Sequence, residues 1–206
     1  MSRTLRGIGV SPGVACAPAL LVRWDFPEVP DRAVRPRCRR QPGLRAGTQT
    51  TAGGDTPDPA VNPKFAHKLA FLDEMRACAA LRCDSNRMIL VGDLNVAPLE
   101  HDVWSHKQML RVVSHTPLEC EKLVAVQNAG GWIDAMRMHT PEPAKLYTWW
   151  SYRSPDWQTA DKGRRLDHIW VAPALADRLT GMRVLKHSRG WLRPSDHVPV
   201  TATLDV

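Results

Sequence analysis

Residues 88–95, with the sequence MILVGDLN, carry the pattern that decides the fold of this chain. A continuous apolar run that stops at a glycine is typical of a strand buried on both faces. Asp93 and Asn95 flank a single residue at the end of that run, so their side chains project to the same side. We therefore expect a central strand with a carboxylate and a carboxamide at its exit, although the same residues also suit an ordinary turn.

Helical patterns lie on either side of this strand. Apolar residues recur at helical spacing over residues 63–82 and predict an amphipathic helix. Thr116 can cap a second helix, Pro117 suits its first turn, and Glu119 occupies the capping-box position. This second helix should end at the two glycines at 130–131.

The C-terminal half is expected to form several short strands. Alternating, β-branched and aromatic residues favour strands over helices there. The strands are expected over residues 146–153, 166–171, 182–187 and 198–204, with a short helix over 173–179. The order of helix, strand, helix and then closely spaced strands predicts a mixed α/β layered domain.

The N-terminal quarter has a different composition from the rest. The chain of 206 residues carries a net charge of +7, but residues 1–50 hold nine Arg and three acidic residues, which leaves 19 basic and 18 acidic residues for the remainder. Residues 1–54 are rich in Arg and Pro without sustained periodicity, so we expect a disordered segment. The overall positive charge is therefore no argument that the domain binds nucleic acid.

Composition also limits the cellular setting. No apolar run reaches the roughly 18 residues of a membrane span, and Pro18 interrupts the short apolar patch near the N-terminus, so neither a membrane helix nor a signal peptide is expected. The five Cys are scattered without zinc-ligand spacing. We expect free thiols in a single cytoplasmic domain.

Two further motifs add acidic and imidazole groups. Asp196 and His197 place a carboxylate beside an imidazole just before an expected strand, where the pair can share a metal or a proton. Asp167 lies inside an otherwise apolar strand, and a buried acid needs a partner. We expect that partner to be His197 or a bound ligand, with an Arg as the alternative. His168 alternates to the opposite face and is interpreted as structural.

Aromatic and basic residues lie near these acids in the sequence. Trp149 and Trp150 are neighbours in an expected strand, so one should face inward and the other outward, where it can pack or stack on a nucleotide. Two basic clusters can meet a phosphate backbone or simply be solvated, namely Lys162, Arg164 and Arg165 before Asp167, and Lys186, Arg189 and Arg193 before Asp196. Carboxylates, a carboxamide and an imidazole together suit a divalent metal and the cleavage of a phosphodiester.

These motifs together resemble those of exonuclease III-type enzymes in the endonuclease/exonuclease/phosphatase superfamily. The resemblance covers residues 53–206 and rests on LVGDLNVAP at 90–98, DVW at 102–104, YTWWSYR at 147–153, RLDHI at 165–169 and PSDHVPV at 194–200. It implies a four-layer α/β sandwich in which residues 55–206 form the C-terminal part of a metal-dependent phosphoesterase domain. It also implies a DNA repair nuclease that uses Mg²⁺ or Mn²⁺ as a 3′→5′ exonuclease and abasic-site endonuclease on abasic or 3′-recessed double-stranded DNA. We expect a monomer if the domain is complete.

The matching motif positions imply roles for individual residues. Asp93 would orient or deprotonate the attacking water, and Asn95 would bind the scissile phosphate. His197 would contact that phosphate with support from Asp167. The implied metal ligands are Asp93, Asn95, Asp196 and His197, and the implied DNA contacts are Trp149, Arg153 and Arg165.

The chain also departs from the family pattern. The first strands of the family carry Asn-x-Asn-Gly and Gln-Glu-x-Lys motifs and a Tyr before a Pro-containing turn, whereas this chain lacks both motifs and its first Tyr is Tyr147. We therefore expect an incomplete first sheet and an incomplete metal site. One hypothesis is that residues 1–51 derive from a shifted reading frame or misassigned start, and the alternative is a genuine disordered extension. The alternative functions are an inactive fragment of the family and a phosphodiesterase for a substrate other than nucleic acid.

Overall fold

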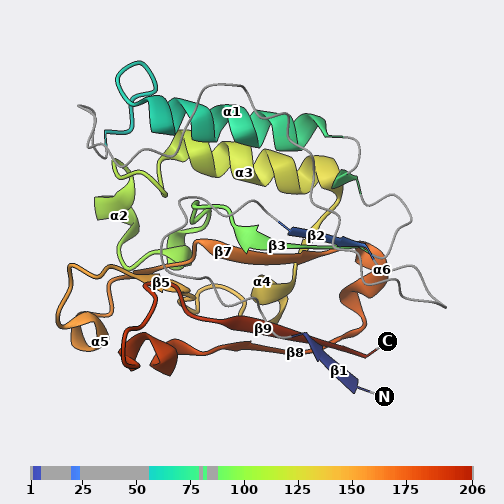
Figure 1. Ribbon diagram of the computed structural model, residues 1–206. Helices are drawn as coiled ribbons and strands as arrows, with labels where there is room; N and C mark the ends of the chain where they lie inside the picture. Colours follow the sequence, from blue (N-terminus) through green and yellow to red (C-terminus); the bar gives the residue numbers. More distant parts are fainter. Residues whose placement is uncertain (1, 6–19, 24–55, 79–80, 83–87, 206) are drawn as a thin grey trace.

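The computed structural model describes residues 2–5, 20–23, 56–78, 81–82 and 88–205, and Figure 1 shows the layers that they form. Two long helices, α1 (Pro63–Ala77) and α3 (Pro117–Gly130), lie side by side over one face of a four-stranded sheet. A three-stranded sheet lies on the other side of that sheet. The mixed α/β layering expected from the sequence is confirmed.

The strands pair antiparallel in all three sheets. The first sheet has the order β2 (Leu20–Arg23), β3 (Met88–Asp93), β7 (Asp167–Val171) and β4 (Ile133–Asp134). The second has the order β1 (Ser2–Leu5), β9 (Val200–Asp205) and β8 (Leu179–Val184). A short ribbon pairs β5 (Trp149–Trp150) with β6 (Gly163–Arg164). The central position of β3 agrees with its continuous apolar sequence.

The two long helices begin and end at identifiable signals. Asn62 caps α1 by accepting hydrogen bonds from two backbone amides, and Thr116 and Glu119 form the predicted capping box of α3. The C-cap of α3 is Gly131, which adopts a left-handed φ of 67° that suits glycine. Helix α3 therefore has the predicted bounds, whereas α1 ends before residue 82 because Cys78 is extended.

The remaining elements are short. The strand predicted over residues 146–153 is reduced to β5, because the chain turns directly after Trp150 and the backbone amide of Ser154 donates to the carbonyl of Ser151. The other short elements are η2 (Glu100–Asp102), α2 (His106–Met109), α4 (Ala135–His139), α5 (Trp157–Ala160), α6 (Pro173–Ala176) and η3 (Lys186–Gly190).

Two apolar clusters lie on opposite faces of the first sheet. Leu90 of β3 packs with Leu72 and Leu123 of the two helices, whereas its neighbour Ile89 packs with Ala202 and other residues between the sheets. Each fully buried side chain of this size stabilises the fold by about 1.5–3 kcal/mol. Strand β3 is thus anchored on both faces, which holds its exit, and the residues there, in a fixed position.

Two strands of the N-terminal quarter are described. Strand β1 pairs with β9, and β2 pairs with β3. The other residues of segment 1–54 lie outside the described residues, so the expectations of disorder and of a shifted reading frame stay predictions. No helix in the described part of the chain is long and apolar enough to cross a membrane. Cys78 and Cys120 are free thiols.

Candidate active site and metal centre

The register of the two central strands brings two carboxylates together. Asp93 is the last residue of β3 and Asp167 is the first of β7, and the two are Cα partners across the antiparallel pair. A shift of the register by one residue would place the two side chains on opposite faces of the sheet. The meeting of two sequence motifs that lie far apart is therefore a consequence of strand pairing.

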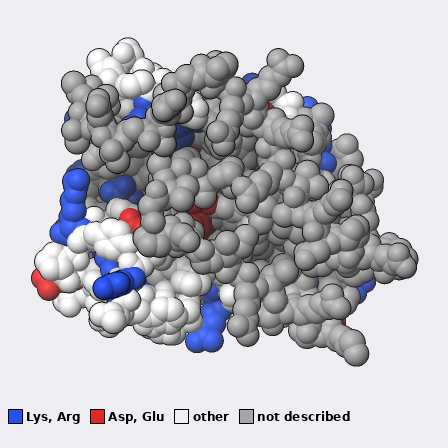
Figure 2. Space-filling view, in the orientation of Figure 1, with Lys and Arg blue, Asp and Glu red and all other residues white. Residues whose placement is uncertain are grey.

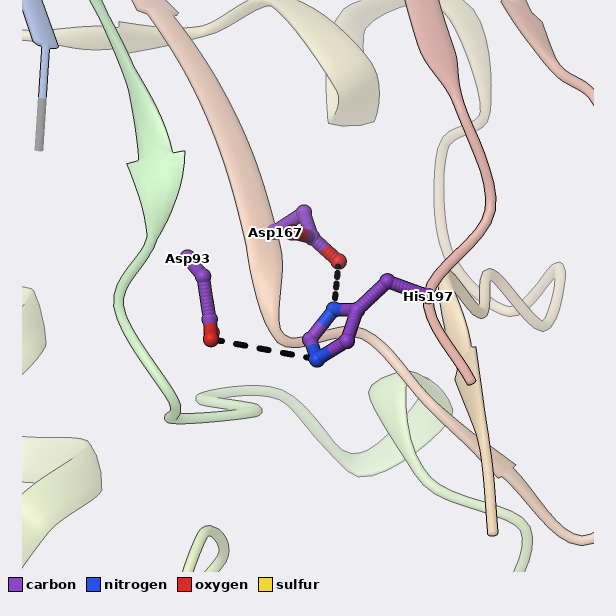
Figure 3. A group of neighbouring side chains, drawn as sticks. All are labelled: Asp93, Asp167 and His197. Atoms are coloured by element: carbon purple, nitrogen blue, oxygen red, sulfur yellow. Dashed lines mark hydrogen bonds and ion pairs between the residues drawn. The ribbon is translucent and has the colours of Figure 1, made fainter. Parts of the chain in front are cut away.

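His197 joins these carboxylates from a third segment. It lies just before β9 and forms an isolated antiparallel bridge with Trp149. Its Nδ1 lies 2.8 Å from Oδ2 of Asp167, and its Nε2 lies 3.8 Å from Oδ2 of Asp93 (Figure 3). The expected contact between Asp167 and His197 is confirmed. Because an ionised carboxylate only accepts hydrogen bonds, the proton on Nδ1 is donated to Asp167, and Nε2 faces Asp93.

Asn95 is attached to Asp93 by two hydrogen bonds. Its backbone N–H donates to Oδ1 of Asp93 and its side-chain Nδ2 donates to Oδ2, each at 2.9 Å. The φ of Asn95 is 56°, in the left-handed region that Asn tolerates better than most residues. The Nζ of Lys68 in α1 donates to the carbonyl of Asn95 at 2.9 Å and also pairs with the buried Glu119 of α3. Both long helices therefore fix the loop that carries Asn95.

Burial and neighbouring charge shift the protonation equilibria of the site. Burial raises the pKa of Asp93 to about 6, and the charge of Asp167 adds to this increase, whereas His197 opposes it. Burial alone would lower the pKa of His197, but the hydrogen bond and the charge of Asp167 outweigh it, so the pKa is raised. The raised pKa of Asp93 brings its titration closer to neutral pH than that of an ordinary carboxyl group, and the raised pKa of His197 favours its protonated form.

The same three side chains meet the distance requirement of a metal centre. The ligand atoms of Asp93, Asp167 and His197 all lie within 4.8 Å of one another. Carboxylate oxygens and an imidazole are suitable donors for a divalent cation. A cation would offset the desolvation and the repulsion from Asp167 that raise the pKa of Asp93, so the donor set fits a metal ion on electrostatic grounds as well.

Asp196 and Trp149 contact each other. Oδ2 of Asp196 accepts a hydrogen bond from Nε1 of Trp149 at 2.9 Å, and the guanidinium of Arg164 lies 4.9 Å from the centre of the Trp149 ring. Asp196 is not one of the three residues that the described part of the chain brings within ligand distance, so its predicted metal binding stays a prediction. Trp149 is half-buried and Trp150 is buried, as their adjacent positions in a strand predicted.

Arg165 corrects the sequence interpretation. Its guanidinium is buried, and its Nε and Nη2 each donate to Asp102 at 2.8 Å while Nη1 donates to Asp134. The prediction that Arg165 contacts DNA is wrong, because two carboxylates already occupy its donors inside the protein. Arg153 is exposed, and its contact with DNA stays a prediction. His168 is buried with Nε2 2.8 Å from the carbonyl of Val96, which confirms its structural interpretation.

The sequence does not reveal the residues that hold the segments of the candidate site in position. Lys68 is a half-buried residue of α1 and Asp102 belongs to the DVW motif, but neither position indicates its partner. The partners lie 27 and 51 residues from Lys68 and 63 residues from Asp102 in the chain. Only the folded structure identifies Lys68 as a support of the loop that carries Asn95, and Asp102 as a partner of Arg165, two residues before β7.

A family comparison agrees with this geometry. A sequence model of the endonuclease/exonuclease/phosphatase family matches residues 5–197. Exodeoxyribonuclease III from Haemophilus influenzae is 29% identical over 146 residues, which cover 68% of this chain and 54% of that protein. The match to the family model therefore spans all the residues of the candidate site.

Solved structures share the fold. An AP endonuclease from Archaeoglobus fulgidus superposes with a TM-score of 0.66 and 26% identity, over 75% of this chain and 59% of its own. A 3′ phosphatase from Neisseria, bound to a product DNA hairpin, superposes with a TM-score of 0.66 and 30% identity, over 75% of this chain and 58% of its own. The chain thus spans a little over half the length of these relatives.

Proposed function

The chain belongs to the endonuclease/exonuclease/phosphatase family, and from this premise we propose that its site hydrolyses phosphodiester bonds of DNA, as exonuclease III-type repair nucleases do. The observation that carries the proposal is the convergence of Asp93, Asp167 and His197 from three separate segments. Scattered acidic residues would not favour the reaction, whereas an acid, a base and a candidate metal centre at one point supply its main requirements.

Asp93 is the proposed orienting group and base for the attacking water. Its pKa of about 6 leaves the carboxylate mostly ionised at neutral pH and makes it a stronger base than an ordinary carboxylate. Two hydrogen bonds from Asn95 hold this carboxylate in one orientation. The side-chain amide of Asn95 lies beside it and is the proposed donor to an oxygen of the scissile phosphate.

His197 is the proposed contact to the developing phosphate charge. Asp167 accepts the proton on Nδ1, so Nε2 is the nitrogen that the substrate can meet. The raised pKa keeps the ring protonated to a higher pH than a free imidazole. A protonated Nε2 donates to a phosphoryl oxygen and stabilises the negative charge that forms during in-line attack.

We propose Mg²⁺ or Mn²⁺ as the bound ion. Asp93 and Asp167 would hold it while a protonated His197 contacts the phosphate, and the family resemblance adds Asn95 and Asp196 to this set. In the alternative set a neutral His197 would be the third ligand through Nε2, which excludes donation from that nitrogen to the phosphate. When bound, such an ion neutralises charge on the phosphate oxygens. The carboxylates bind the ion only while they are ionised, so metal affinity should fall as the pH drops through the raised pKa of Asp93.

Abasic or 3′-recessed double-stranded DNA is the proposed substrate. The names of the Haemophilus exodeoxyribonuclease and the Archaeoglobus AP endonuclease support this choice. Trp149 supports it too, because its indole is half-buried beside His197 and can stack on a nucleotide. The exposed Arg153, in the turn after β5, is the proposed contact to the DNA backbone.

The proposal is tested with two labelled duplexes, one 3′-recessed and one containing a single abasic-site analogue. We expect cleavage that requires added Mg²⁺ or Mn²⁺ and falls by about 100-fold or more in Asp93→Asn and in His197→Ala. The matched control is Asp73→Asn, which removes an exposed carboxylate that pairs with Lys122 between α1 and α3. This control should cleave within about twofold of the wild-type rate, because surface pairs contribute little.

Two other results would replace the proposal. Hydrolysis of bis-p-nitrophenyl phosphate or of a phospholipid, without hydrolysis of DNA, would assign the site to a phosphodiesterase for another substrate. A folded protein that hydrolyses none of these esters with either metal would be an inactive member of the family. Circular dichroism of each variant separates loss of function from loss of folding.

A further inference from the structure

Two adjacent apolar side chains protrude near the candidate site. Leu192 is 96% exposed and its neighbour Trp191 is 56% exposed, and we call these two residues the 191–192 tip. A single exposed leucine is ordinary on a protein surface. Two large exposed apolar side chains next to each other are less ordinary, and folding does not require them at the end of a loop. Leu192 in particular buries almost nothing, so a polar residue at that position would leave the fold equally stable.

The 191–192 tip is held in place at both ends. On one side, the backbone N–H of Trp191 donates to the carbonyl of Ser188, and the rings of Trp191 and His187 pack edge to face at 5.8 Å. On the other side, Tyr152 Oη donates to the carbonyl of Pro194 at 2.7 Å. These contacts make the tip a fixed projection of η3 and of the turn after β5.

The backbone directly after the tip adopts an uncommon conformation. Arg193 has a φ of 54°, in the left-handed region that side chains other than glycine rarely adopt. The following residues then lead into the site, where the backbone N–H of His197 donates to Oγ of Ser195 at 3.1 Å. The strained turn lies between the tip and the segment that carries His197.

Positive charge accompanies the tip. Arg153 and Arg193 are exposed, and neither forms an ion pair with any residue that the structure describes. The guanidinium of Arg189 lies 4.8 Å from the centre of the Tyr152 ring and supports the same turn. Figure 2 shows Lys and Arg side chains on the described surface at the end of the molecule where Figure 1 places α5 and β5. An apolar projection flanked by cations complements a nucleobase and its phosphates.

The chain length between the tip and the site limits where the tip can reach. Leu192 precedes His197 by five residues, and a fully extended chain spans at most about 3.5 Å per residue, so their separation is at most roughly 18 Å. One strand of duplex DNA advances about 3.4 Å per nucleotide. The tip therefore lies within about five nucleotides of a phosphate bound at His197.

We propose that the 191–192 tip contacts the bases or groove of the bound DNA duplex, within about five nucleotides of the phosphate that is cleaved. The inference rests on the proposed function for the identity of the partner. Leu192 enters the groove or wedges against a base step, and Trp191 stacks or packs beside it. Arg193 and Arg153 bind the flanking phosphates and fix the register of the duplex.

The test measures binding without cleavage. The full chain is titrated, in Ca²⁺, against a duplex that carries one tetrahydrofuran abasic analogue, and affinity is followed by fluorescence anisotropy at several salt concentrations. Leu192→Ser and Trp191→Ala should each weaken binding by about 3- to 10-fold without changing the salt dependence, because the lost contacts are apolar. Arg193→Gln should weaken binding and reduce the salt slope by about one. The matched control is Leu118→Ser, an exposed leucine on α3.

A positional measurement locates the contact. 2-Aminopurine is placed at successive positions from one to ten nucleotides from the analogue, and the wild-type protein should increase its fluorescence only within about five nucleotides. Leu192→Ser should abolish this increase. The inference is overturned if both tip variants bind as the wild type does and leave the profile unchanged, or if sedimentation shows that the tip mediates self-association. Failure of cleavage with a retained 2-aminopurine signal would overturn the proposed function alone, and failure to bind any DNA would overturn both.

Discussion

The contact between Asp167 and His197 decides which nitrogen of the imidazole is available for chemistry. Replacement of Asp167 by Asn should lower the pKa of His197 in the metal-free protein, because the negative charge that raises it is removed. An NMR titration of the His197 ring in EDTA measures this change, and the exposed His67 on α1 serves as an internal reference. An unchanged titration of His197 would show that Asp167 does not set its protonation.

The same contact predicts a pH dependence of stability. The folded-state pKa of His197 lies above the ordinary value of 6.5, so the folded state binds the proton more tightly than the unfolded state. The resulting stabilisation is complete below about pH 6.5 and is lost as the pH rises through the folded-state pKa. Urea unfolding across this window should therefore have a smaller pH slope in Asp167→Asn than in the wild type.

The buried Arg165 should contribute to stability rather than to DNA binding. Arg165→Met leaves the carboxylates of Asp102 and Asp134 without their shared partner and should cost about 3–5 kcal/mol in urea unfolding. Arg165→Lys should recover only part of this loss, because one ammonium cannot reproduce the geometry of the planar guanidinium. The exposed Arg153→Met is the control and should stay within about 0.5 kcal/mol of the wild type. Equal effects of the Arg165 and Arg153 substitutions would contradict the assignment.

The end of α3 contains two glycines, and a different physical constraint requires glycine at each. A Cβ on Gly130 would overlap the side chain of Trp132 and lie 2.7 Å from the carbonyl of Leu81, whereas a Cβ on Gly131 would meet nothing within 4 Å. Gly131 instead has a φ of 67°. Gly130→Ala should therefore cost about 1–3 kcal/mol through overpacking, and Gly131→Ala about 1 kcal/mol through backbone strain.

Asparagine substitutions separate the two causes. Asn tolerates the left-handed conformation, so Gly131→Asn should be more stable than Gly131→Ala in thermal unfolding. Gly130→Asn should be no better than Gly130→Ala, because its larger side chain meets the same obstacles. Improvement of both positions by Asn, or of neither, would contradict this explanation of the helix end.

Elements with local signals could be predicted from the sequence, and elements without them could not. The bounds of α3 follow from Thr116, Glu119 and Gly131, which are close in sequence to the backbone groups that they satisfy. Strand β5 is shorter than predicted because its pairing partners are distant, with Trp150 N–H donating to the carbonyl of Asp196. The composition of residues 146–153 reports a preference for strand but contains no information about where the chain must turn.

The residues of the candidate site could be predicted from the sequence, but the residues that hold them in position could not. Asp93, Asn95, Asp167 and His197 were identified by their short motifs, and the structure places all four in one connected group. The assignment of Arg165 failed because a basic residue before a strand looks solvated, and its acidic partners lie 63 and 31 residues away. The sequence pattern therefore indicates the chemistry, and the long-range pairing decides which charged residues can reach a ligand.

The proposed metal binding predicts that the stability of the protein depends on the ion. Burial and the charge of Asp167 disfavour the ionised Asp93, so Asp93→Asn should raise the thermal midpoint of the metal-free protein. Mn²⁺ at 100 times its dissociation constant should stabilise the wild type by about 2.7 kcal/mol, which corresponds to roughly 5–10 °C for a chain of this size. Asp93→Asn should lose this shift, whereas Asp73→Asn should keep it, because Asp73 is exposed and paired with Lys122. If Asp93→Asn destabilises the metal-free protein and the variant still responds to Mn²⁺, the ion binds elsewhere. The expected result is a variant that is more stable without metal and no longer responds to Mn²⁺. That result would show that Asp93 binds the ion and lowers the stability of the metal-free fold.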